Sequence, residues 1–98
     1  MTQIIRETKR IHIIITGKVQ GVGFRAYVHH TANKLGLSGW VRNVGYNQVE
    51  TVAEGNPDIL EFFVEGVRTG PRSGRVDDLY LSWEIPLGNM IKFEIRFD

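Results

Sequence analysis

Two glycines and an arginine, placed between an apolar run and a helical pattern, are the residues of this chain best suited to chemistry. The stretch ITGKVQGVGFR, residues 15–25, carries Gly21, Gly23 and Arg25. Glycines let backbone N–H groups turn toward one point, and a helix start adds unpaired N–H groups and a positive dipole end. Such a turn can bind an anion, most naturally a phosphate. A cation in the first helical turn opposes the dipole unless an anion is bound there, so Arg25 strengthens this prediction.

The elements on either side of this loop must position it. Residues 11–19 are rich in β-branched side chains and predict a central strand. Residues 24–35 repeat apolar side chains at helical spacing and predict a helix that ends at Gly36. Further strands are expected over 38–44, 48–54, 76–84 and 91–98, and a second helix from Asn56-Pro57-Asp58. We expect a single domain over residues 1–98, with residues 1–9 as an N-terminal extension.

The order β-α-β-β-α-β followed by a last strand predicts an α+β fold of the ferredoxin-like type. Two helices, each with one apolar stripe, would cover one face of an antiparallel-rich sheet. In this topology the first two strands run parallel, with the third inserted antiparallel between them. Their carboxyl ends therefore meet at one edge of the sheet, about 10 Å apart at ordinary strand spacing. We expect the glycine loop and Arg42-Asn43 to converge there and form the active site.

Composition excludes several function classes. The 98 residues are 42% hydrophobic and 23% charged, which is typical of one ordinary globular domain. The 12 basic and 11 acidic residues are too balanced for bulk attraction to nucleic acid or to an anionic membrane. The chain has no cysteine, so thiolate catalysis and disulfides are excluded. Residues 1–10 lack the apolar segment of a signal peptide and no run reaches transmembrane length, so we expect a cytoplasmic protein.

Two nucleotide-binding motifs fit the glycine loop poorly. The string GVGFRA matches G-x-G-x-x-A, but 98 residues cannot hold a doubly wound sheet and a hairpin follows. A P-loop requires Gly-Lys-Ser/Thr at the close of the loop, whereas Gly17-Lys18 stands at its opening. The chain shares with both motifs only the arrangement of a strand, a glycine turn and a helix start, which can surround a phosphate.

The histidines and the strand aromatics are assigned to structure rather than to a site. Three histidines show no metal-ligand spacing with carboxylates and are expected on the surface or in packing: His12, His29 and His30. Three aromatic residues on predicted strands are expected to pack in the core rather than to stack on RNA: Tyr80, Trp83 and Phe93.

Two segments resemble the signatures of the acylphosphatase family. Residues 15–25 agree at every defined position with an apolar residue, then any residue, then G-x-V-Q-G-V-x-F-R. Residues 39–55, GWVRNVGYNQVETVAEG, are similar to G-W-V-x-N-x-x-x-G-x-V followed by a further glycine. Asn47 stands where the family usually has glycine. Because asparagine also tolerates a left-handed turn conformation, we expect the hairpin to persist.

The resemblance implies hydrolysis of acyl phosphates to a carboxylate and inorganic phosphate, without a metal or a cofactor. It implies that Arg25 binds the phosphate and that Asn43 orients the attacking water. The implied cradle is the backbone N–H groups of Gln20, Gly21, Val22, Gly23, Phe24 and Arg25. Since a carboxylate leaves readily, positioning and charge stabilisation can carry the rate without a strong general acid. The substrate phosphate is a candidate acceptor of the water proton, and the side chains of Lys18 and Gln20 are expected to be loop scaffolding.

Two other function classes stay open at this stage. One is a non-catalytic phosphate- or carbamoyl-phosphate-binding module, because a similar domain opens a larger carbamoyl-transferring maturation protein. The other is a ferredoxin-like interaction module without chemistry, against which the intact pair Arg25 and Asn43 argues. The chain starts at Met1 and stops just after its last predicted strand, which favours a free-standing enzyme. We expect that enzyme to act as a monomer on a small-molecule acyl phosphate.

Overall fold

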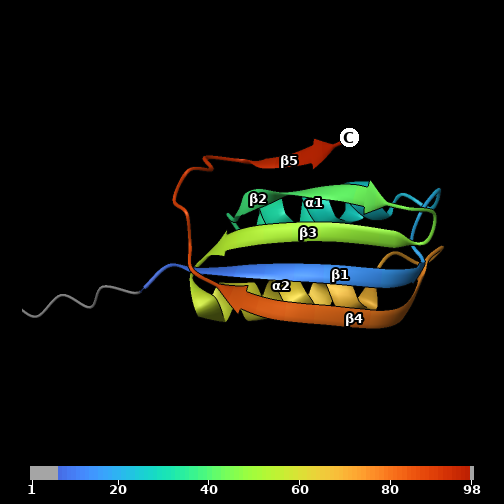
Figure 1. Cartoon of the computed structure of the whole chain (residues 1–98), viewed down its shortest axis with the longest axis horizontal. Helices are drawn as coiled ribbons and strands as arrows, with labels where there is room; N and C mark the ends of the chain where they lie inside the picture. The colour runs from blue at the N-terminus through green and yellow to red at the C-terminus, as the bar shows by residue number, and fades with distance from the viewer. Residues whose placement is uncertain (1–6, 98) are drawn as a thin grey trace, which may run out of the picture.

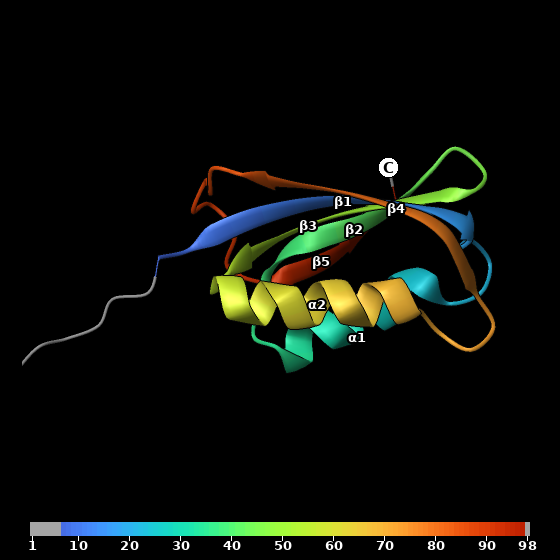
Figure 2. The ribbon, with the colours of Figure 1, turned by 90° about the horizontal axis from the view of Figure 1, so that it is seen from below.

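Five strands form one sheet, and two helices cover one of its faces, in the computed structural model, which describes residues 7–97 (Figures 1 and 2). The elements are β1 (Lys9–Lys18), α1 (Phe24–Lys34), β2 (Ser38–Val44), β3 (Gln48–Gly55), α2 (Pro57–Thr69), β4 (Arg75–Glu84) and β5 (Phe93–Arg96). The strand order is β4-β1-β3-β2-β5, and every neighbouring pair is antiparallel except β2 with β5. The predicted ferredoxin-like α+β topology is confirmed, with β5 added at one edge of the sheet.

The core lies in the single layer between the sheet and the helices (Figure 2). Alternate residues of β1 point into this layer, so Ile11, Ile13 and Ile15 are fully buried. The helices supply apolar stripes at helical spacing from Val28 and Ala32 on α1 and from Leu60, Phe63 and Val67 on α2. The layer anchors both ends of the loop that joins β1 to α1.

The ends of the helices follow local signals in the sequence. Asn56 accepts a hydrogen bond on Oδ1 from the backbone N–H of Asp58 at 2.8 Å, and Pro57 occupies the first helical position of α2. The helix α1 ends at Lys34, and Gly36 takes the left-handed conformation that closes it, with φ of 69°. Both predicted signals are confirmed.

The first and last strands differ in extent from the prediction. Strand β1 begins at Lys9 rather than at residue 11, and residues 1–6 of the predicted extension lie outside the described residues. Strand β5 pairs with β2 only as far as Arg96 opposite Arg42, so the predicted strand over 91–98 is too long at both ends. Ile91 and Phe97 continue the alternating apolar pattern but lie outside the paired part of this strand, and they are 97% and 81% exposed.

Of the three strand aromatics that were expected in the core, Tyr80, Trp83 and Phe93, only Phe93 is buried there. Phe93 is buried, with its ring centre 6.0 Å from that of Phe63. Tyr80 is 68% exposed and Trp83 is 47% exposed, so the core prediction for these two is wrong. The reason is that β4 is an edge strand, where Tyr80 lies on the face without helices and Trp83 at the rim of α2.

The hairpin between β2 and β3 is present as predicted. Gly45 supplies the left-handed residue of its turn, with φ of 60°. Among the described residues no side-chain-bearing residue has a positive φ, so Asn47 keeps an ordinary backbone conformation. The tolerance of asparagine for a left-handed turn is therefore not what preserves the hairpin.

Candidate active site

The loop after β1 turns at two glycines with left-handed backbone conformations. The φ angles of Gly21 and Gly23 are 71° and 75°, and Gly23 stands at the N-cap of α1. The start of α1 has no side-chain cap and no acidic residue in its first turn, whereas α2 has the cap of Asn56 and the acidic Asp58. The first N–H groups of a helix have no partners within the helix. The start of α1 is therefore suited to an anion, as the sequence predicts.

A cavity of about 260 Å³ lies beside this loop. The loop follows the end of β1, at the edge of the sheet where β2 also ends (Figure 1). Its lining residues come from the loop, the first turn of α1, β2 and the C-terminal end of the chain: Val19, Gly21, Gly23, Phe24, Arg25, Ala26, Asn43, Ile95 and Phe97. Among the described residues that line it, Arg25 alone is charged. The cavity therefore combines one cation and the helix start with largely apolar walls.

Asn43 reaches the cavity from the end of β2. Strands β1 and β2 are both antiparallel to β3, so their carboxyl ends lie at the same edge, as the topology predicts. The Oδ1 atom of Asn43 is buried and accepts no hydrogen bond from residues 7–97. Buried side-chain oxygens in proteins are nearly always paired. This oxygen is an acceptor without a donor beside the cavity, which fits the water-orienting role implied by the resemblance.

The Arg25 side chain is held by the C-terminal end of the chain. Its Nη1 donates a long hydrogen bond of 3.4 Å to the carbonyl oxygen of Arg96, and its Cζ lies 4.7 Å from the ring centre of Phe97. A guanidinium that stacks on an aromatic face keeps its in-plane N–H groups free to donate. The contact of Phe97 with Arg25 cannot be predicted from the sequence, because the place of Phe97 in an alternating pattern indicates only a strand.

Gln20 and Lys18 differ in their contacts. The Gln20 side-chain Nε2 donates to the carbonyl oxygens of Val44, Gly45 and Gln48 at 3.2, 3.1 and 2.9 Å. This agrees with the scaffolding role expected of that side chain. Lys18 is exposed and is not among the residues that line the cavity.

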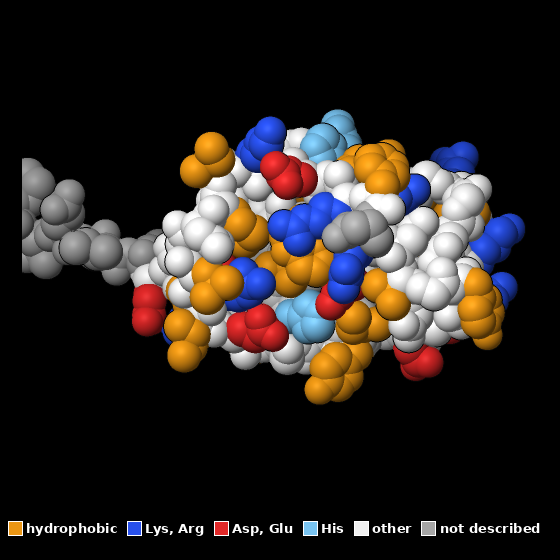
Figure 3. Space-filling view, turned by 45° about the horizontal axis from the view of Figure 1, so that its top comes forward, with side chains coloured by type: hydrophobic (Ala, Val, Ile, Leu, Met, Phe, Trp, Pro, Cys, Tyr) orange, Lys and Arg blue, Asp and Glu red, His pale blue; other side chains and the backbone are white. Residues whose placement is uncertain are grey.

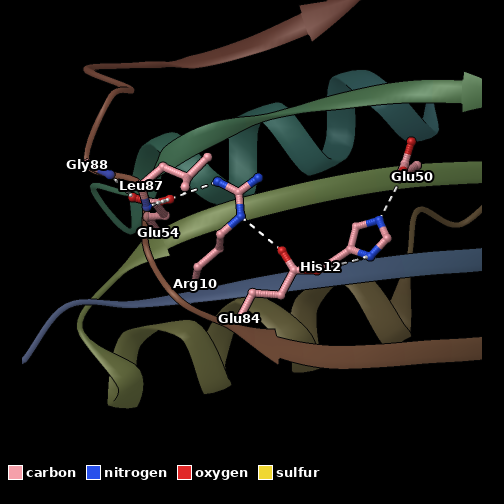
Figure 4. Close-up of polar contacts among 7 residues, drawn as sticks. All are labelled: Arg10, His12, Glu50, Glu54, Glu84, Leu87 and Gly88. Carbon is pink, nitrogen blue, oxygen red and sulfur yellow. Dashed lines mark hydrogen bonds and ion pairs between the residues drawn. The ribbon is translucent and has the colours of Figure 1, made fainter.

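A polar network occupies the sheet face away from the helices, and it holds one of the three histidines (Figure 4). His12 Nε2 lies 2.6 Å from Glu50 Oε2, and Arg42 Nε donates to Glu50 Oε1 at 2.7 Å. Burial alone would raise the pKa of Glu50, but hydrogen bonds from His12 and then Arg42 outweigh it, so the pKa of Glu50 is lowered. No histidine is among the described residues that line the cavity.

The same face carries a second carboxylate with several donors. Glu54 is 4% exposed and accepts hydrogen bonds from Arg10 Nη1 at 2.8 Å and from the backbone N–H groups of Leu87 and Gly88 at 2.9 and 3.1 Å (Figure 4). It thereby fixes the segment that crosses from β4 to β5. Basic and acidic side chains lie next to one another on this side of the molecule (Figure 3).

The described residues form neither a metal-ligand cluster nor a membrane-spanning helix. Within residues 7–97 there is no group of three or more His, Asp or Glu side chains arranged to hold a metal ion. Neither α1 nor α2, the helices of that part of the chain, has the length and apolar character needed to cross a membrane.

Comparison with known proteins gives a consistent result. The family model named Acylphosphatase matches residues 11–95. The chain is 45% identical over 87 residues to an acylphosphatase of Trichormus variabilis, which covers 89% of this chain and 85% of the relative. Its fold matches the crystal structure of acylphosphatase from Bacillus subtilis with a TM-score of 0.86 and 39% identity, covering 90% of this chain and 98% of that one.

A larger protein contains a similar domain. The crystal structure of full-length HypF in the phosphate- and nucleotide-bound form matches with a TM-score of 0.83 and 26% identity. The match covers 97% of this chain but 12% of HypF.

The fold and the cavity define a small ferredoxin-like domain with a glycine loop and an uncapped helix start at its sheet edge. The family match and the relatives identify it further: the chain belongs to the acylphosphatase family, enzymes that hydrolyse acyl phosphates.

Proposed function

We propose that this chain hydrolyses acyl phosphates at the cavity between the glycine loop and Asn43. The observation that carries the proposal is the meeting, in one cavity, of an uncapped helix start, a single cation and a buried unpaired amide oxygen. The backbone N–H groups of residues 20–25 and Arg25 hold the phosphate. Asn43 Oδ1 accepts a hydrogen bond from the attacking water and aims its oxygen at phosphorus.

The reaction needs little beyond this arrangement. The water oxygen forms a bond to phosphorus, and the bond between phosphorus and the acyl oxygen breaks. The carboxylate leaves with the bonding electron pair, and the water proton passes to a phosphate oxygen. A carboxylate is stable as an anion, so no acid has to protonate it. Charge stabilisation by Arg25 and the helix start, together with orientation by Asn43, supplies the catalysis.

The direct test is release of inorganic phosphate from benzoyl phosphate by the purified chain in the presence of a metal chelator. We expect turnover that survives the chelator, and the Arg25→Ala variant serves as the inactive control. Turnover that stops with the chelator and returns with added metal, or no turnover at all, would contradict the proposal.

A phosphate-binding domain without turnover is the second candidate, and the similarity to HypF is the observation that favours it. The curated relatives support the enzyme instead, because they carry the name acylphosphatase and are matched over most of their length. The benzoyl phosphate assay separates the two candidates.

We also propose that the chain works as a monomer in the cytoplasm. One copy of the chain supplies the glycine loop, the cation Arg25 and Asn43 to the cavity, so the proposed reaction needs no residue from a second copy. Light scattering during gel filtration at assay concentration tests the first statement, and cell fractionation tests the second.

A further inference from the structure

One side-chain amide joins the two halves of the candidate active site. Gln20 stands at the start of the phosphate cradle, and its Nε2 faces three carbonyl oxygens of the β2–β3 hairpin at 2.9–3.2 Å. An amide nitrogen has two N–H groups. Three acceptors around it therefore occupy its donor capacity completely.

The hairpin that Gln20 holds is the one that carries the water-orienting residue. Val44, one of its acceptors, directly follows Asn43 in β2. A backbone hydrogen bond of 3.0 Å from Gly17 N–H to the Asn47 carbonyl oxygen reinforces the same junction. Strands β1 and β2 are not neighbours, because β3 lies between them. Gln20 thus forms a direct bridge between the cradle and the end of β2, in addition to the path through the sheet.

We infer that Gln20 is a positioning residue of the hydrolysis, which sets the separation between bound phosphate and the water on Asn43. The inference rests on the proposed function. Attack on phosphorus requires the reacting atoms to lie about 3–3.5 Å apart and in line, and a misplacement of about 1 Å can cost about 100-fold in rate. Without the bridge the hairpin can shift against the cradle, and Asn43 moves with it.

The same contacts separate this role from a direct contact with substrate. Because the Nε2 donors of Gln20 are taken up by hairpin carbonyls, the side chain contributes its hydrogen bonds to the hairpin and not to the phosphate. The cradle uses backbone N–H groups and Arg25, which do not depend on the Gln20 amide. Loss of the amide should therefore reduce kcat while phosphate binding is kept.

The experiment compares Gln20→Met, which keeps the length of the side chain without its donors, with the wild-type chain. Turnover of benzoyl phosphate and inhibition by inorganic phosphate are measured on both. We expect kcat to fall about 10- to 100-fold, with the inhibition constant for phosphate unchanged within about twofold. In ¹H–¹⁵N spectra we expect the Asn43 side-chain amide to shift, while Gly21 and Gly23 respond to phosphate as in the wild type.

Thr69→Val is the matched control. It also deletes a side-chain hydrogen bond to a backbone carbonyl, from Thr69 Oγ1 to Glu65 O at 3.0 Å, at the far end of α2 from its cap and outside the cavity lining. We expect it to retain wild-type kcat. Gln20→Glu is the second variant: it keeps the length but sets a carboxylate against three carbonyls, and should lose at least as much kcat as Gln20→Met.

Three results would overturn the inference. An unchanged kcat in both Gln20 variants shows that the bridge is dispensable. A phosphate inhibition constant that rises as much as kcat falls makes Gln20 a binding residue. A fall in kcat with no shift of the Asn43 amide points to a general loss of structure. Failure of the proposed function is distinct, because it would appear as a wild-type chain that does not hydrolyse benzoyl phosphate.

Discussion

Replacing Asn43 with alanine should remove turnover and leave both the fold and the phosphate site in place. Within residues 7–97 no group donates to Asn43 Oδ1, so the substitution breaks no hydrogen bond at that atom. A typical intramolecular hydrogen bond contributes about 1 kcal/mol to stability. We therefore expect the free energy of unfolding to change by less than about 1 kcal/mol, which is a shift in Tm of less than about 4–8 °C for a chain of this size.

The effect on the reaction should be much larger. Orientation of the attacking water by a placed hydrogen-bond partner is the kind of contribution whose loss costs about 100- to 1,000-fold in rate. The phosphate cradle and Arg25 are untouched, so the inhibition constant of inorganic phosphate should stay within about twofold of the wild type.

The assay for Asn43→Ala is phosphate release from benzoyl phosphate, with inorganic phosphate as the inhibitor and a thermal melt of each variant. Asn33→Ala, at an exposed position of α1 outside the cavity lining, controls for loss of an asparagine. Equal losses of turnover and phosphate affinity would refute the reasoning, since Asn43 would then be a binding residue. A large fall in Tm would instead make it a structural residue.

Substitutions at three further residues test other parts of the structure. Arg25→Ala should weaken phosphate inhibition by about 100-fold or more, because at least two charge-assisted hydrogen bonds worth about 1.5–3 kcal/mol each are lost; an unchanged inhibition constant would remove Arg25 from the site. Phe97→Leu should weaken phosphate inhibition about two- to fivefold, the equivalent of about 0.5–1 kcal/mol of cation–π contact, and Phe97→Tyr should restore it; equal effects of both variants would exclude the ring contact. Burial alone would raise the pKa of Glu54, but the hydrogen bonds from Leu87, Arg10 and Gly88 lower it by more than burial raises it. The pKa of Glu54 therefore lies below its ordinary value of 4.5. A carboxylate whose pKa is lower in the folded state stabilises the fold at pH above its unfolded-state pKa, and that stability is lost as the pH falls through its folded-state pKa. The free energy of unfolding, measured with urea between pH 7 and pH 3, should therefore depend less on pH for Glu54→Gln than for the wild type. The same pH dependence in both would count against the pairing of Glu54.

Local signals in the sequence predict much of this fold, because the residues responsible act on their own neighbours. Asn56 and Pro57 define the start of α2 through a cap and a preset φ, and Gly36 defines the end of α1 through a left-handed φ. The strand order then follows from connectivity, since a hairpin and two crossovers leave few arrangements of the sheet. That order alone predicts that Asn43 lies beside the glycine loop, and both line the same cavity.

The parts that could not be predicted depend on distant partners. Tyr80 is exposed because β4 is an edge strand. The alternation of side chains along β4 does not indicate whether the strand is central or at an edge. Phe97 continues the apolar pattern of β5 but lies beyond the last paired residue, where it meets Arg25 from α1. The hydrogen bonds of Gln20 join it to residues more than 20 positions away. Their acceptors are backbone carbonyls, which every residue has, so no residue type in the sequence predicts them.

In the proposed reaction the cavity holds the phosphate and directs water onto phosphorus. Hydrolysis of benzoyl phosphate by the wild-type chain in ¹⁸O-labelled water tests this claim most directly, with mass spectrometry of both products. If Asn43 aims the water at the phosphate held by Arg25 and the glycine loop, the label enters inorganic phosphate and benzoate remains unlabelled. Label in benzoate would show attack at the carbonyl carbon and would contradict the account.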